Sequence, residues 1–289
     1  MKKDRSKFNR IENRIFMVLL RLSVILLLAI VISLLLYLVL RGLFKGANIK
    51  NGFNINLEFL TTLTNDGGKT GGILGIVINT FFLITLVVLI ASPIGVASAV
   101  YLSIYAKEGR FREFVKSFIE VLSGIPSIIF GLFGMLLFVG VFNLGYSLIS
   151  GVLTLVLMIL PTIIVASENA ITSVDRSLIE ASIGLGATWS ETTFKVVLKA
   201  ARSGIISGII LALGRAMGET AALMYTVGSK TEIATSLTSS SRPLSMHIYL
   251  GINEGQSLDK AFASSLVLIV MVLIINSISK KLLKCGDKK

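Results

Sequence analysis

Histidine and cysteine, which build most metal and disulfide sites in proteins, are nearly absent from this sequence. The 289 residues contain one histidine, His247, and one cysteine, Cys285. A single cysteine excludes a disulfide within the chain, and a single histidine leaves no cluster for zinc or iron. Charge is also scarce, since 15% of the residues are charged, against about 25% in a soluble domain. We therefore expect a membrane protein that holds no metal and binds no cofactor itself.

Long apolar runs fill most of the sequence. Hydrophobic residues make up 54% of the chain, and the mean hydropathy is +0.85. Six runs are long enough to cross about 30 Å of hydrocarbon as helices, near residues 15–40, 72–105, 114–142, 146–170, 204–226 and 261–278. The sequence predicts an all-α, polytopic membrane protein with six transmembrane helices. The membrane domain covers residues 15–280, between an N-terminal segment, 1–14, and a tail, 281–289.

The basic residues indicate the orientation of these spans. The chain has a net charge of +12, but its Lys and Arg side chains flank apolar runs, which argues against a nucleic-acid partner. Nineteen of them fall on one side of the six spans and seven on the other. Because cytoplasmic loops carry more Lys and Arg, both termini are expected in the cytoplasm of a multi-pass protein of the cell membrane. The first run is too long for a signal peptide and is expected to remain as an anchor.

Enzymatic activity is not expected. The sequence contains no credible cluster of a nucleophile and a base. The only stretch that resembles a phosphate-binding P-loop is Gly67-Gly68-Lys69-Thr70. It has Leu63 where the motif needs its leading glycine, and no buried strand precedes it. We expect a glycine-rich turn there.

Two charged residues lie inside the fifth run. Arg215 and Glu219 are four residues apart, so on one helix they would share a face and could pair. Charges at membrane depth usually line a bundle interior or a wet pathway. Arginine suits an oxyanion such as phosphate or sulfate, a neighbouring carboxylate would ease its release, and Thr220 lies alongside. The alternative is an ion pair that only locks helices together.

The third and second runs add weaker candidates. Pro126 must kink or break the third helix, because proline lacks a backbone N–H. If the helix is broken, Ser123, Ser127 and freed backbone groups could face the pathway; a simple kink is the alternative. Asn79, in the second run, could face the pathway or bond across a helix interface.

The inner loop, residues 171–203, carries a recognisable pattern. It predicts two short amphipathic helices broken around Gly184 and Gly186, with Ser177 capping the first through a capping box with Glu180. An interfacial linker is the plain alternative. The run Glu180-Ala181-Ser182, then Gly186 and the stretch 196–198, resembles the EAA loop of ABC importer permeases, although Lys199 stands where that family has proline. The resemblance implies that Glu180, Ala181, Ser182 and Gly186 couple to a separate ATPase, which would hold ATP and Mg²⁺.

Other stretches extend the resemblance over most of the chain. Residues 56–61, 71–76, 125–134 and 214–221 are similar to the phosphate ABC importer permeases, and more to the PstA-type than to the PstC-type subunit. The resemblance implies a type I permease fold, a PstC-type partner, two PstB-type ATPases and an external PstS-type phosphate-binding protein. Three alternatives stay open: a PstC-type subunit, a permease for another oxyanion, and an ion-coupled secondary carrier.

Overall fold

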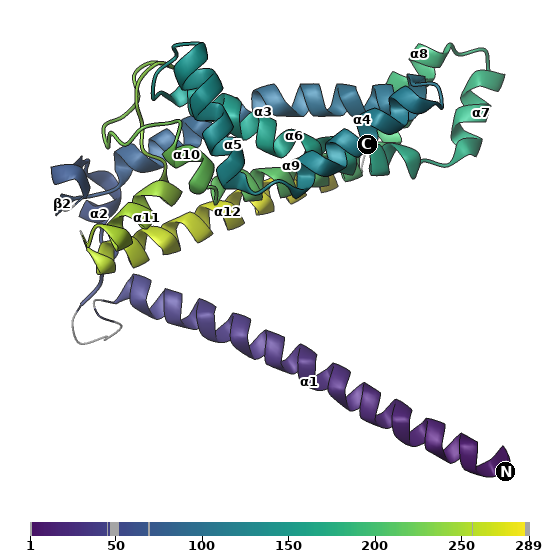
Figure 1. Ribbon diagram of the computed structural model, residues 1–289, viewed down its shortest axis with the longest axis horizontal. Helices are drawn as coiled ribbons and strands as arrows, with labels where there is room; N and C mark the ends of the chain where they lie inside the picture. The colour runs from purple at the N-terminus through teal and green to yellow at the C-terminus, as the bar shows by residue number, and fades with distance from the viewer. Residues whose placement is uncertain (1, 45, 47–51, 69, 256, 287–289) are drawn as a thin grey trace.

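The computed structural model describes residues 2–44, 46, 52–68, 70–255 and 257–286. Most of this part of the chain is helical, which confirms the predicted all-α class. The long helices of the body run side by side along one axis, while the first helix diverges from them (Figure 1).

The elements fall into three groups by length and type. The long helices are α1 (Lys2–Leu43), α3 (Leu74–Val100), α4 (Arg110–Gly124), α6 (Leu148–Thr172), α9 (Leu198–Met217) and α12 (Leu258–Gly286). The short helices are α2 (Leu57–Thr61), α5 (Ser127–Gly134), α7 (Arg176–Gly184), α8 (Trp189–Thr192), α10 (Ala221–Met224) and α11 (Leu244–Asn253). Wider π-helical turns are η4 (Tyr101–Tyr105), η5 (Met135–Val141) and η6 (Thr193–Val197), and the strands β1 (Thr64–Asn65) and β2 (Thr70–Gly71) form a hairpin around the turn η3 (Asp66–Gly68).

Five helices of the described chain are long and apolar enough to cross a membrane. They are Asn13–Leu43, Leu74–Tyr105, Leu148–Thr172, Trp189–Met217 and Leu258–Ser279. A sixth span exists if Arg110–Gly124 and Ser127–Val141, which are bent by 101° at their break, count as one. With the bent pair counted as one span, the structure has a span for each of the six predicted runs, but the third is not a straight helix. The fifth was predicted to continue to Thr226, and it ends at Met217.

The core of the body lies where α3, α6 and α9 pack together. Its largest cluster includes Leu83, Val87, Leu155, Ile159 and Ala212, each of them buried. Small residues allow the helix axes to approach closely. A Cβ atom built on Gly208 would lie 2.4 Å from that of Ala166, and one on Gly204 would lie 2.5 Å from that of Ala170.

Helix α1, in its described residues, contacts the body only near its C-terminal end. It contacts α12 near the end of α1, where Gly42 lies against Leu266 and the ring of Tyr37 meets that of Phe262 edge-on. From Asn13 to Tyr37 its described side chains are exposed or nearly so. In Figure 1 the remainder of α1 extends away from the other helices. The apolar surface of α1 is therefore available to lipid or to another chain.

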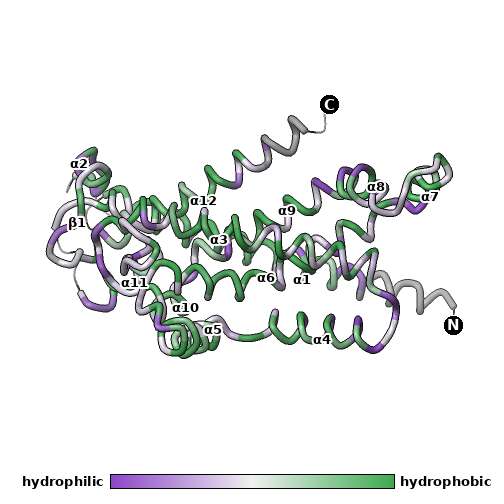
Figure 2. Tube along the Cα trace, turned by 90° about the horizontal axis from the view of Figure 1, so that it is seen from above, coloured by the Kyte–Doolittle hydropathy of each residue, from purple (hydrophilic) through white to green (hydrophobic). Residues whose placement is uncertain are grey.

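The loops alternate between two ends of the molecule. The β-hairpin, α2 and α11 gather at one end, whereas α7, α8, the beginning of α1 and the end of α12 lie toward the other (Figures 1 and 2). This is the arrangement that an even number of spans requires. The hairpin turn carries Gly67 at φ +67° and Gly68 at φ +120°, so the P-loop lookalike is a glycine turn in its described part; Lys69 lies outside the described residues.

Candidate functional site

The first break in the membrane helices falls at Gly124-Ile125-Pro126. Ile125 is extended, with φ −70° and ψ 131°, because a residue that precedes proline is disfavoured in helical geometry. Pro126 then starts α5, where its missing N–H costs nothing. The bend of 101° confirms a broken helix and excludes a simple kink. Pro126 and Ser123 are exposed and Ser127 is half-buried, while the Ser123 hydroxyl donates to the Ile119 carbonyl at 2.9 Å.

The second break follows α9 and corrects the predicted pairing of Arg215 with Glu219. Helix α9 ends at Met217, so Glu219 does not share a helix face with Arg215. Glu219 instead starts α10, because its Oε1 accepts a hydrogen bond from the Ala222 N–H at 3.1 Å. Among the described residues these two charges form no ion pair. Arg215 is exposed on the last turn of α9, while Glu219 and Thr220 are half-buried.

The two breaks lie against each other. Helix α5 packs on α10, and a Cβ atom built on Gly131 would lie only 2.8 Å from the Cα of Ala222. Gly134, one turn further, faces Thr154 of α6, whose Oγ1 would lie 2.1 Å from an added Cβ. Only glycine permits this approach of α5 to its neighbours. Packing of the two half-helices therefore brings the predicted pathway residues around Pro126 and Glu219 into one region of the fold.

Of the two roles predicted for Asn79, the structure shows the bond across an interface between helix and loop. Its side chain is fully buried, donates to the Glu232 carbonyl at 2.8 Å and accepts from the Ala234 N–H at 2.8 Å. The neighbouring Thr80 accepts from the Leu244 N–H at 2.8 Å. Both side chains therefore attach the segment between α10 and α11 to α3. The placement of Asn79 in the pathway is corrected, since its amide is occupied and buried in this structure.

The segment between α10 and α12 is more deeply packed than its polar sequence indicated. Arg242 is 6% exposed and donates to the carbonyls of Ser229 at 2.9 Å and Gly67 at 2.6 Å. His247 of α11 is 3% exposed, and burial together with the nearby Arg242 and Lys260 lowers its pKa to about 4. Sequence reasoning assigned neither residue. The lone histidine of the chain was the available signal.

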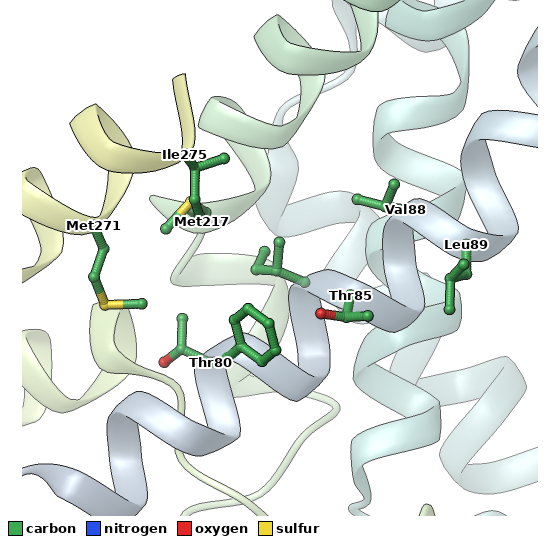
Figure 3. A pocket seen from close by; sticks show the side chains of 9 residues that line it. Thr80, Thr85, Val88, Leu89, Met217, Met271 and Ile275 are labelled. Carbon is green, nitrogen blue, oxygen red and sulfur yellow. The ribbon is translucent and has the colours of Figure 1, made fainter. Parts of the chain in front are cut away.

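An apolar cavity of about 250 Å³ lies next to the second break (Figure 3). Side chains of α3, α12 and the end of α9 surround it, among them Thr85, Met217 and Met271. The residues that line it carry no charge, and the hydroxyl of Thr80 already donates to the Ile76 carbonyl. An oxyanion would lose its hydration there without gaining ionic partners, so this cavity does not suit an anion.

The inner loop forms a ledge of two short helices, as predicted. Gly186 makes the break with φ +87°, a conformation that favours glycine, and the Ser182 hydroxyl contacts that of Thr192 at 2.9 Å across the turn. Glu180 and Ala181 are exposed on α7, and Leu185 at its end is 90% exposed. The ledge therefore presents charged and apolar side chains together, as a protein-binding surface does.

The caps of this ledge differ from the prediction. The N-cap of α7 is Asp175, whose Oδ1 accepts from the Ser177 N–H at 2.9 Å, so Ser177 does not cap the helix with Glu180. This hydrogen bond to the backbone lowers the pKa of the Asp175 carboxyl. The capping box lies instead at Thr188 and Glu191, which begin α8. Asp175, two residues before Ser177, caps the helix in its place because a carboxylate is a stronger hydrogen-bond acceptor than a hydroxyl.

An ion pair between two spans was also missed. Lys116 of α4 pairs with Glu168 of α6, and the Glu168 side chain is 13% exposed. The signal was Glu168 itself, the one charged residue of the run 146–170, two residues before its end. This pair attaches the first half of the broken span to the core.

These features define a class: a polytopic helical membrane protein with one broken span that packs against the short helix after another span, and a helical ledge at one end. The family described as "Binding-protein-dependent transport system inner membrane component" matches residues 91–284. The chain belongs to this family.

Individual relatives and a solved structure agree with that assignment. The "Probable ABC transporter permease protein YqgI" of Bacillus subtilis is 35% identical over 254 residues, which cover 82% of this chain and 86% of that protein. The "Phosphate transport system permease protein PstA 2" of Mycobacterium bovis is 37% identical over 212 residues, covering 72% and 70%. The fold is similar to that of an inward-facing MetNI methionine ABC transporter, with a TM-score of 0.57 at 18% identity over 74% of this chain and 94% of that one. The predicted permease fold is confirmed.

Proposed function

We propose that this chain is a PstA-type pore subunit of an ATP-driven importer that moves inorganic phosphate across the cell membrane. The observation that carries the proposal is the meeting of the broken span, which contains Pro126, with α10, the short helix that follows the end of α9 just after Arg215. Half-helices that end inside a membrane protein leave polar groups for a solute, as transporter sites require. The phosphate transport named for the M. bovis relative supports the choice of substrate.

Arg215 is the group that we assign to the anion. It is exposed, it makes no ion pair within the described chain, and it lies on the last turn of α9 close to the break. A guanidinium can donate two parallel hydrogen bonds to phosphate oxygens. Glu219 and Thr220 at the same break, and Ser123 and Ser127 at the other, complete the proposed pathway.

Energy for transport would come from other chains. We assign the ledge, with Glu180, Ala181, Ser182 and Gly186, to contact with a PstB-type ATPase, present in two copies and carrying ATP and Mg²⁺. A PstC-type permease would complete the pore, and a PstS-type phosphate-binding protein would dock at the end formed by β1, β2 and α11. The ledge and both termini are then cytoplasmic, as the excess of basic residues indicates.

Transport in liposomes tests this proposal. The chain is reconstituted with its second permease, ATPase and binding protein, and uptake of radiolabelled phosphate is measured with ATP on the ATPase side. We expect uptake that stops when ATP or the binding protein is omitted and that excess sulfate or molybdate does not suppress.

Two results would replace the proposal with an alternative. Accumulation of sulfate or molybdate in preference to phosphate would make the chain a permease for another oxyanion. Uptake by the chain without any ATPase, abolished by an ionophore that collapses the ion gradient, would make it a secondary carrier.

A further inference from the structure

An apolar trough runs along one face of α4. It consists of two adjoining cavities of about 570 and 350 Å³, which share Phe118, Leu122 and Leu157 in their walls. The trough begins beside Phe111 at the start of α4 and reaches Phe133, beyond the bend into α5. Helices α3 and α6 and the turn η4 supply its opposite wall, mostly with apolar side chains.

Helix α4 has few buried contacts with the body of the protein. Ile119 is the buried residue of this helix, and the pair of Lys116 with Glu168 is the ion pair that joins it to α6. Figure 2 shows α4 running beside α6 and then turning sharply into α5. An occupant of the trough would therefore stabilise the arm of the broken span against the core.

The dimensions and depth of the trough suit one acyl chain of a lipid. The 15 residues of α4 extend about 22 Å as a helix, and one leaflet of the hydrocarbon core is about 15 Å thick. The wall helices α3 and α6 are membrane spans, so the trough lies at the depth of the acyl chains. Bulk lipid is as apolar as the trough, so the acyl chain alone gives no selectivity. The headgroup must provide it.

Three basic residues lie where the trough begins, in a stretch that also contains Glu108 and Glu113. Lys107, Arg110 and Arg112 lie within six residues of each other, at the end of the trough next to Tyr101 and Phe111. Within the described part of the chain, the Nε of Arg112 is buried without a hydrogen-bond partner. Its contact with Glu108 is 3.8 Å long, and that carboxylate is 96% exposed. Basic pockets between transmembrane helices bind anionic lipid headgroups, and aromatic residues mark the same interface.

We infer that an anionic phospholipid binds here, with one acyl chain in the trough and its phosphate on the cluster of Lys107, Arg110 and Arg112. The bound lipid holds α4 against α3 and α6 and so fixes the angle of the break at Pro126. This inference depends on the membrane placement of α3, α4 and α6. It does not depend on the transported solute, so its test measures lipid binding and not transport.

The experiment uses the assembled complex in a neutral detergent. Phosphatidylglycerol, phosphatidylcholine with the same acyl chains, and inorganic phosphate are each titrated in, while native mass spectrometry counts bound lipid and a thermal scan follows unfolding. We expect phosphatidylglycerol to bind and to raise the unfolding temperature, phosphatidylcholine to bind at least tenfold more weakly, and phosphate to do neither.

Variants locate the site. Arg110→Gln with Arg112→Gln should weaken phosphatidylglycerol binding at least tenfold, whereas Lys230→Gln, which removes an exposed cation elsewhere, should not. Leu122→Trp should fill the trough and exclude the lipid. Leu211→Trp is its matched control, since Leu211 is 68% exposed on α9. If Leu122→Trp fails to assemble, the arginine variants still decide the headgroup site.

Several outcomes would overturn the inference. Equal binding of the two lipids, or unchanged phosphatidylglycerol binding in the arginine variants, would mean that the cluster selects no headgroup. A rise in unfolding temperature with phosphate alone would make it an anion site unrelated to lipid. Leu122→Trp that retains its lipid but loses the second permease would show that the trough is a subunit interface.

Discussion

At the scale of single residues, Arg215 and Glu219 do separate tasks. Glu219 accepts the Ala222 N–H and so starts α10, whereas Arg215 keeps its guanidinium exposed beside the break. Because the two do not pair, exchanging them cannot rebuild a lost ion pair. An arginine at position 219 would also have no acceptor for the Ala222 N–H.

We therefore predict that Arg215→Gln assembles normally but imports little phosphate. Losing a charged hydrogen-bond donor costs about 1.5–3 kcal/mol, or roughly a 10- to 100-fold fall in uptake. Glu219→Gln should be milder, because its amide oxygen can still accept from the Ala222 N–H. Uptake of radiolabelled phosphate, normalised to assembled complex, measures both, with Lys199→Gln at the other end of α9 as the control. Uptake by Arg215→Gln within twofold of the wild type would remove Arg215 from the pathway.

The sequence identified Arg215 and Glu219 as charged candidates, but it did not show whether they lie on one helix face. Spacing of four residues predicts a shared face only while the helix continues, and α9 ends between them. The partners of Asn79 were equally inaccessible, because Glu232 and Ala234 lie about 150 residues further along the chain. Contacts of that separation depend on how the helices pack, which local patterns do not specify.

His247 gives the stability of the protein a pH dependence. Its pKa is about 4 in the folded chain and about 6.5 when unfolded. Between these values the unfolded state binds more protons, so stability falls as the pH drops from about 6.5 to about 4. The full effect of one such group is on the order of 3 kcal/mol.

Replacing His247 with glutamine should remove this part of the pH dependence. Both proteins are unfolded thermally in detergent at pH 7 and at pH 4.5, and the quantity compared is the drop in unfolding temperature between the two. We expect a smaller drop for His247→Gln, whatever its absolute stability. Equal drops would show that His247 is already accessible to protons in the folded state.

At the scale of elements, breaks and turns carry the proposed function. The sequence predicted the break at Pro126 as one of two alternatives, because proline removes a backbone hydrogen bond and so either kinks or breaks a helix. It did not predict the bend of 101°, which depends on α5 reaching α10 through Gly131. The ledge was predicted better, because its turn is determined locally by Gly186 at φ +87°.

Two glycines of the ledge, only two residues apart, give a matched pair of variants. Gly186→Val forces a branched side chain into a left-handed conformation, at a cost of about 1–3 kcal/mol. Gly184 is helical with open space around it, so Gly184→Ala should be neutral. We predict that Gly186→Val and the charge reversal Glu180→Lys insert into the membrane but lose stimulation of the ATPase by the permease.

The measurement is ATP hydrolysis by the copurified complex, relative to the ATPase alone. Gly184→Ala should retain wild-type stimulation, which would show that substitution near the ledge is tolerated in general. Wild-type stimulation in both Gly186→Val and Glu180→Lys would exclude this ledge as the coupling surface.

At the scale of the whole molecule, the sequence specified the class and the number of crossings. Apolar length alone predicted the spans, because a helix must be a certain length to cross the hydrocarbon. The position of α1 away from the other helices was not predictable, because an apolar helix has a similar sequence whether lipid or protein covers it. The two ends of the molecule are defined by the structure, whereas their assignment to the inside and outside depends on the distribution of Lys and Arg.

That assignment can be tested with single cysteines in a Cys285→Ser background. Asn65 in β1 and Thr238 before α11 are exposed at one end, and Ser190 in α8 is exposed at the other. On intact cells, a membrane-impermeant maleimide should label Asn65→Cys and Thr238→Cys, and it should label Ser190→Cys only after permeabilisation. The labelled fraction after permeabilisation serves as the control for reactivity at each position. The reverse pattern would invert the orientation, and with it the assignment of the ledge to an ATPase, since ATP is in the cytoplasm. Labelling of all three on intact cells would mean that the two ends do not lie on opposite sides of the membrane, and the set of spans itself would be wrong.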